Sequence, residues 1–219
     1  MPVVHLIRHG QASFGAADYD VLSDVGHQQA KLLAVALVRR EIRPDRIVAG
    51  SLQRQRDTAA TCAEAAAWEL PVDTDPRFDE YNHVGLLREP GAAAAVGLAD
   101  GRAVQEALDA ALLDWIQSGR LTSDGRTFAQ WRDDAVGAQR DLLASLGRGG
   151  TGLVFTSGGV VAAVCADLLG LDPDGFLALA RVVVNTGITK IVSGRGGISL
   201  ISFNDHGHLE GGADLVTYR

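Results

Sequence analysis

Cysteine is scarce in this sequence, with two residues among 219, Cys62 and Cys165. Neither belongs to a Cys-x-x-Cys pair, so they supply neither a zinc site nor a disulfide framework. Each lies among small apolar residues, which predicts two buried free thiols. His206 and His208 alternate in the manner of metal ligands, but no second histidine or cysteine motif completes a site. We interpret them as part of a polar loop and expect no bound metal.

Basic residues are fewer than acidic ones: the chain has 20 lysines and arginines and 27 aspartates and glutamates, which gives a net charge of −7. A protein with this balance repels polyanions as a whole. We therefore expect neither nucleic acid nor an anionic membrane as a partner. A small anion would have to be held by a local group of arginines or by backbone amides.

Long apolar runs are also missing, since none approaches the length of a membrane-spanning helix. The stretch Met1 to Ile7 lacks the basic region and the long apolar segment of a secretory signal peptide. We therefore predict a cytoplasmic protein. Hydrophobic residues make up 47% of the chain and charged residues 21%, a composition that supports one folded domain with a hydrophobic core.

Short apolar runs alternate along the chain with longer stretches that repeat with helical period. The short runs predict strands, and the longer stretches, with capping residues before them, predict helices. We predict strands at 3–7, 46–49, 152–156, 189–193 and 198–203, and helices at 24–40, 53–67, 103–117, 128–146 and 158–169. The stretch 71–90 has no period that indicates a helix or a strand.

This alternation predicts a three-layer α/β/α sandwich with a mainly parallel central sheet. The glycine-rich stretch 194–197 predicts a hairpin, which makes the last two strands antiparallel at one edge. We expect a single domain over residues 1–219, with a helical insertion at about 85–127 that includes the alanine-rich stretch 91–96. The edge formed by the closing hairpin could pair with a second copy, which makes a homodimer possible.

Polar motifs gather where strands of this predicted sheet end, and ligands bind at such ends in parallel sheets. The ordered motifs are LIRHGQAS at 6–13, LSDVGHQQA at 22–30, SLQRQRDTA at 51–59 and FDEYNHVG at 78–85. Taken together, this ordered set resembles the histidine phosphatase superfamily, which contains cofactor-dependent phosphoglycerate mutases and many small phosphomonoesterases. The resemblance covers almost the whole chain and is weakest at 91–127.

The resemblance implies a role for four residues. His9 occupies the position of the nucleophile, a neutral imidazole that attacks phosphorus and forms a phosphohistidine. Arg8 and Arg54 occupy the phosphate-binding positions, and a guanidinium suits the oxygens of a phosphoryl group. Glu80 occupies the position of the acid and base, which requires a carboxyl group with a raised pKa. Arg56 and Asp79 are the adjacent competitors of Arg54 and Glu80, and both are expected to point elsewhere.

One position departs from the family. The resemblance implies a second histidine before the glycine at 158, and this chain has Ser157 there. A serine donates one neutral hydrogen bond, while the amides of Gly158 and its neighbour can still hold phosphate oxygens at the start of a helix. The asparagine often found six residues after the nucleophile is Gly15 here. The sequence leaves open whether His27 or His83 substitutes for the second histidine.

The resemblance therefore implies a metal-independent phosphomonoesterase without a cofactor, acting through phospho-His9 on a small phosphorylated substrate. Two alternatives stay open. One is a cofactor-dependent phosphoglycerate mutase, which the changes at Ser157 and Gly15 disfavour. The other is a non-catalytic module that binds phosphate or phosphopeptides, which the change at Ser157 favours. The substrate is not encoded in any motif, because specificity would come from the insertion.

Overall fold

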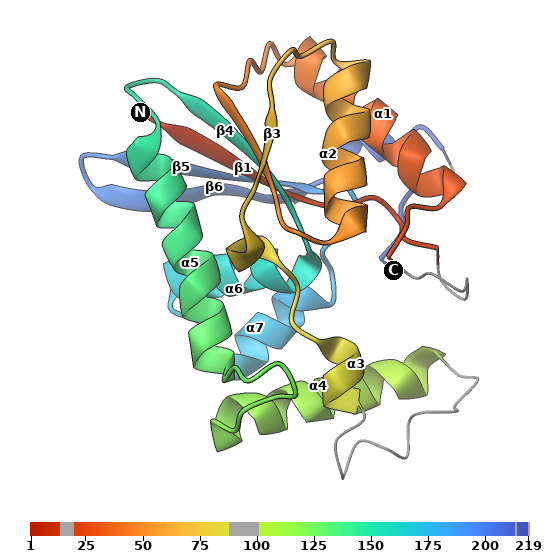
Figure 1. The fold of residues 1–219 in the computed structure, drawn as a ribbon, viewed down its shortest axis with the longest axis vertical. Coiled ribbons are helices and arrows are strands. Elements are labelled where there is room, and N and C mark those ends of the chain that lie inside the picture. The colour runs from red at the N-terminus through yellow and green to blue at the C-terminus, as the bar shows by residue number, and fades with distance from the viewer. Residues whose placement is uncertain (14–19, 88–100, 213, 219) are drawn as a thin grey trace.

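The computed structural model describes residues 1–13, 20–87, 101–212 and 214–218, and its centre is a sheet with helices on both faces (Figure 1). The strand order is β3-β2-β4-β1-β5-β6. The strands are β1 (Val3–Arg8), β2 (Arg46–Ala49), β3 (Val72–Thr74), β4 (Thr151–Thr156), β5 (Ile188–Gly194) and β6 (Gly197–Asp205). The pairs among β1 to β4 are parallel, and β5 is antiparallel to both β1 and β6. The predicted fold class is confirmed.

The two central strands, β1 and β4, are buried on both faces of the sheet. Leu6 of β1 packs into the core on one face, and its neighbour Ile7 packs into the core on the other. Both side chains are completely buried. Because successive strand residues point to opposite faces, a run that is apolar at every position is what a central strand requires.

Helices cover the two faces in separate groups (Figure 1). Helices α1 (Asp24–Arg39) and α2 (Gln53–Ala65) pack on the Ile7 face, and α5 (Phe128–Ser145), α6 (Gly158–Leu169) and α7 (Pro173–Ala180) pack on the Leu6 face. The N-termini of α1 and α5 are capped by residues directly before them. The Ser23 side chain accepts a hydrogen bond from the amide of Gly26, and the Thr127 side chain accepts one from the amide of Gln130. The five predicted strands and five predicted helices are all present, and their ends agree with the predicted ranges to within two residues.

Several short elements were not predicted from the sequence. These are β3, the 3-10 helices η1 (Pro76–Phe78) and η3 (Gly207–Leu209), and the helices α3 (His83–Leu87) and α7. Helix α7 has a readable start, because the Asp172 side chain accepts from the amide of Gly175 and Pro173 is the first helical residue. The other elements are too short for a periodic pattern to emerge.

Helix α4 (Gly101–Ser118) lies within the predicted insertion at about 85–127, and α3 spans the start of that insertion (Figure 1). The alanine-rich stretch 91–96 and Gly15 are outside the described residues. Trp115 of α4 packs edge-on against Phe128 of α5, with ring centroids 5.4 Å apart, and also contacts Trp131. These aromatic contacts attach α4 to the main body of the protein.

Both cysteines are free and buried, as predicted. Burial raises the pKa of each thiol to about 12, so neither thiol is ionised near neutral pH. Among the residues that the structure describes, no helix is long and apolar enough to cross a membrane.

Candidate active site

His9 follows directly after β1 and is held by groups from three other segments. Its amide donates to the carbonyl of Thr156 at the end of β4, at 2.8 Å. Its carbonyl accepts from the side-chain amide of Asn185 at 2.9 Å. The next amide, of Gly10, donates to Oγ1 of Thr58 on α2 at 3.0 Å. The side chain of His9 is only 5% exposed, so its position is fixed by the fold.

The hydrogen bonds of His9 fix which ring nitrogen carries the proton. Nδ1 lies 2.7 Å from the carbonyl oxygen of Gly10, and a carbonyl only accepts, so Nδ1 is the donor. Nε2 accepts a hydrogen bond from Nε of Arg54 at 3.1 Å. Burial, followed by the charges of Arg54 and Arg8, holds the pKa of His9 well below its ordinary value. The ring is therefore neutral, with the lone pair of Nε2 directed into the site.

Arg54 lies in the first turn of α2 and is buried, whereas Arg56 is exposed. The Nη1 atom of Arg54 forms a 2.6 Å ion pair with Asp20, whose second carboxylate oxygen accepts from the amide of Gln53 at 2.8 Å. Asp20 therefore places a carboxylate at the start of α2, where the helix dipole favours an anion. Asp20 was not predicted from the sequence, because no local pattern connects it to a helix more than thirty residues away.

Arg8 is the last residue of β1 and faces the start of α6. Its Nη1 atom donates to the carbonyl of Val183 at 2.5 Å. A Cβ atom added at Gly158 would lie 3.6 Å from Nε of Arg8, so the guanidinium packs beside that glycine. The charge of Arg8 adds to the lowering of the pKa of His9 by burial and Arg54, and it opposes the rise that burial causes in the pKa of Glu80.

Glu80 reaches the same helix start from the loop after η1. Its Oε2 atom accepts from the amide of Gly159 at 3.0 Å. Burial raises the pKa of Glu80, and the Gly159 amide, Arg54 and Arg8 oppose that shift. A Cβ atom at position 159 would lie 2.2 Å from Oε1 of Glu80, so a larger residue there would displace the Glu80 carboxyl group. Asp79 points away and accepts from both the amide and the hydroxyl of Ser51.

Ser157 lies between β4 and α6 and is completely buried. It occupies the position before the first residue of α6, but its side chain does not cap that helix. Instead, its Oγ atom accepts from Nε2 of Gln55 at 2.8 Å. Gln55 was not predicted from the sequence, because no sequence signal separates it from an ordinary polar residue on a helix.

The other histidines lie in different surroundings. His27 is exposed on α1, 3.3 Å from the hydroxyl of Thr61. His83 begins α3, and its pKa is lowered by burial and then by the charge of Arg54, so His83 is within range of that charge. His208 lies 3.0 Å from the hydroxyl of Thr186. Within the described ranges, no three histidine, cysteine or acidic side chains are grouped in a way that could hold a metal ion.

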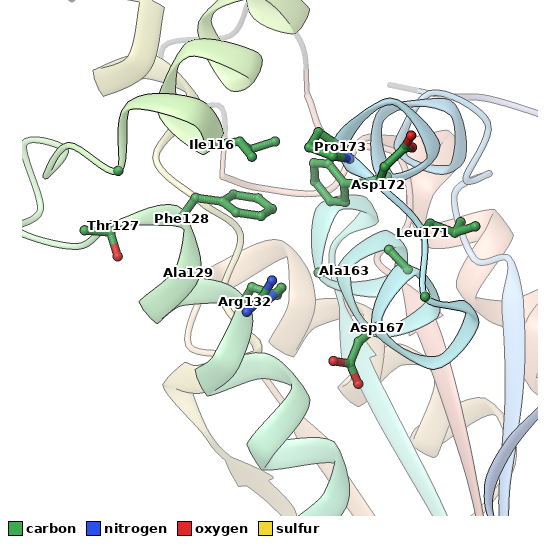
Figure 2. Close-up of a pocket in the computed structure, with 14 residues that line it drawn as sticks. Ile116, Thr127, Phe128, Ala129, Arg132, Ala163, Asp167, Leu171, Asp172 and Pro173 are labelled. Carbon is green, nitrogen blue, oxygen red and sulfur yellow. The ribbon is translucent and has the colours of Figure 1, made fainter.

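A cavity of about 680 Å³ lies elsewhere, between α4, α5, α6 and α7 (Figure 2). Phe128 and Phe176 form apolar walls, and Arg132 and Asp167 lie at its side. None of the predicted site residues lines this cavity. The candidate active site is instead the cluster of His9, Arg8, Arg54, Glu80 and the start of α6, at the carboxyl ends of β1 and β4.

The fold and this cluster define an α/β protein with a neutral histidine between two arginines and a carboxyl group. The chain belongs to the histidine phosphatase superfamily (branch 1), whose family model matches residues 4–206. A comparison with curated proteins gave no match.

Solved structures with the same fold carry phosphatase names. A phosphoserine phosphatase mutant from Entamoeba histolytica, in complex with phosphoserine, is 22% identical with a TM-score of 0.69, and the match covers 95% of this chain and 100% of that chain. A mycobacterial glucosyl-3-phosphoglycerate phosphatase, in complex with inorganic phosphate, is 23% identical with a TM-score of 0.65, over 94% of this chain and 98% of that chain. At these identities the likeness shows the fold.

Proposed function

We propose that this protein is a metal-independent phosphomonoesterase that acts through a phosphohistidine at His9 on a small phosphorylated substrate. The observation that carries the proposal is the 3.1 Å contact between Arg54 and Nε2 of His9. This contact places a ring nitrogen that carries no proton beside a guanidinium cation. The nitrogen can attack a phosphoryl group, and the cation can bind the oxygens of that group. Family membership and the phosphatase names of the structural neighbours support the same reading.

In the first step, the lone pair of Nε2 attacks phosphorus and the bond from phosphorus to the ester oxygen breaks. The departing oxygen takes the proton of Glu80, which its raised pKa keeps available. In the second step, water attacks the phosphohistidine and gives its proton to the Glu80 carboxylate, which releases inorganic phosphate and neutral His9. Arg8, Arg54 and the amide of Gly158 neutralise the phosphoryl oxygens, and Ser157 lies beside that amide.

The test is hydrolysis of p-nitrophenyl phosphate by the purified protein in the presence of a chelator. We expect turnover by the natural protein, no turnover by His9→Ala, and an acid-labile phosphohistidine in protein that is quenched during turnover. Turnover by His9→Ala would overturn the proposal. Binding of phosphate esters without hydrolysis would indicate the non-catalytic module instead. Interconversion of phosphoglycerates only when the bisphosphate cofactor is added would indicate the mutase.

A further inference from the structure

Gln55 has every hydrogen-bonding group of its side chain in use, although it is completely buried. Its Nε2 atom donates to the carbonyl of Phe78 at 3.0 Å and to Oγ of Ser157 at 2.8 Å. Its Oε1 atom accepts from the amide of Leu52 at 3.3 Å. A buried amide satisfied in this way has one orientation, because any rotation would leave a polar atom unpaired.

The partners of Gln55 belong to the segments that carry the proposed chemistry. Gln55 is next to Arg54 on α2, Phe78 comes two residues before Glu80, and Ser157 comes two residues before the Gly159 amide that donates to Glu80. The carbonyl of Phe78 also accepts from Oγ1 of Thr156 at 2.7 Å. Gln55 therefore links the backbone that leads to Glu80 with the helix start that binds the Glu80 carboxyl group.

Two neighbouring residues, Gly50 and Ser157, accommodate the side-chain amide of Gln55. A Cβ atom at Gly50 would lie 2.0 Å from Oε1 of Gln55 and 2.7 Å from Oδ1 of Asp79, so a larger residue there would displace the amide. Ser157 stands before the first residue of α6, where serine usually caps the helix. Its oxygen instead accepts from Gln55, and no cap bond to α6 forms.

We propose that Gln55 is a positioning residue that holds Glu80 at the place where it protonates the leaving group. This inference rests on the proposed function. Gln55 does not touch the substrate and acts through Phe78 and Ser157. Loss of the link lets the Glu80 segment shift relative to α6, and small displacements of a general acid reduce its contribution strongly.

The inference predicts a dependence on the leaving group. A p-nitrophenolate ion is a good leaving group and needs little help from an acid, whereas a phenolate ion needs a proton more. A defect in the placement of Glu80 therefore slows hydrolysis of phenyl phosphate more than hydrolysis of p-nitrophenyl phosphate. A defect that only loosens the fold slows both equally, so the ratio of the two kcat/KM values separates these causes.

The test compares Gln55→Met with Gln139→Met. Both changes replace a buried glutamine with an unbranched apolar side chain of similar length, but the amide atoms of Gln139 have no hydrogen-bond partner among the described residues. We expect Gln55→Met to lower kcat/KM about tenfold more for phenyl phosphate than for p-nitrophenyl phosphate. Gln139→Met should keep the ratio of the natural protein. An unchanged ratio in Gln55→Met would overturn the inference.

Two further variants cover the case in which Gln55→Met does not fold. Thr156→Val removes the other side-chain donor to Phe78, and Ser157→Ala removes the second partner of Gln55. Each should shift the ratio in the same direction, and Ser157→Ala should lower kcat/KM by about tenfold or less. Unchanged ratios in both would overturn the inference. If the natural protein hydrolyses neither ester, or His9→Ala remains active, the proposed function fails and this inference fails with it.

Discussion

The Nε hydrogen of Arg54 points at Nε2 of His9 across 3.1 Å, in a site where both side chains are more than nine-tenths buried. Burial first, and then the charges of Arg54 and Arg8, lower the pKa of His9, and the contact places a cation beside the nitrogen that would attack phosphorus. The same guanidinium binds Asp20 through Nη1, so Arg54 already holds one anion.

Replacing Arg54 should remove most of the activity. Arg54→Ala deletes the cation that contacts the nucleophile, and we expect kcat/KM for p-nitrophenyl phosphate to fall on the order of a hundredfold or more. Arg8→Ala should have a similar effect. The control is Arg56→Ala, which removes an exposed arginine two residues along the same helix and should change kcat/KM by less than about twofold. Equal effects at 54 and 56 would contradict the assigned site.

Asp20 should compete with phosphate for Arg54. Asp20→Asn keeps the shape of the side chain but removes the negative charge 2.6 Å from Nη1, so the site becomes more positive. We expect inorganic phosphate to inhibit hydrolysis at roughly threefold to tenfold lower concentration. Asp24→Asn, an exposed aspartate in the first turn of α1, is the matched control. Weaker inhibition in Asp20→Asn would show that the carboxylate instead orients Arg54 for phosphate.

Glu80 should set the alkaline limb of the pH profile. Its pKa is raised by burial, so its acid form persists to higher pH than that of an exposed glutamate, and activity should fall as pH rises through that ionisation. Glu80→Gln should lower kcat/KM for phenyl phosphate roughly a hundredfold or more and remove this limb. The measurement is kcat/KM against pH after correction for ionisation of the ester itself. An alkaline limb that persists unchanged in Glu80→Gln would assign it to another group.

His5 should make stability depend on pH. Burial first, and then Lys190 and Arg40, lower its pKa from 6.5 to about 4. Between these values the unfolded chain binds a proton that the folded chain does not, so stability rises with pH and is lost as pH falls. In His5→Phe, the decrease in the free energy of unfolding from pH 7 to pH 5 should be smaller by about 2 kcal/mol.

Urea unfolding at the two pH values measures this difference. His27→Phe changes an exposed histidine on α1 and serves as the control, and its pH dependence should match that of the natural protein. If His5→Phe also matches the natural protein, the acid sensitivity comes from other groups.

Local patterns in the sequence were enough to predict the elements that depend on neighbouring residues. A short, nearly continuous apolar run predicted β1, and a capping serine followed by apolar residues at helical spacing predicted α1. The ordered motifs carry the family resemblance, and that resemblance implied roles for Arg8, His9, Arg54 and Glu80. The order of these motifs predicted the family, and the family model over residues 4–206 confirms it.

The way in which these side chains are held depends on contacts between segments that lie far apart in the chain. Asp20 meets Arg54, and Gln55 meets Ser157, across separations of 34 and 102 residues. The spacing of apolar residues along the chain predicts which face of a helix or strand is buried. It does not predict which polar groups meet within the core, so such pairs cannot be found from the sequence pattern. The protonated nitrogen of His9 and the raised pKa of Glu80 likewise depend on burial and on charges from other segments. These quantities exist only once the chain has folded.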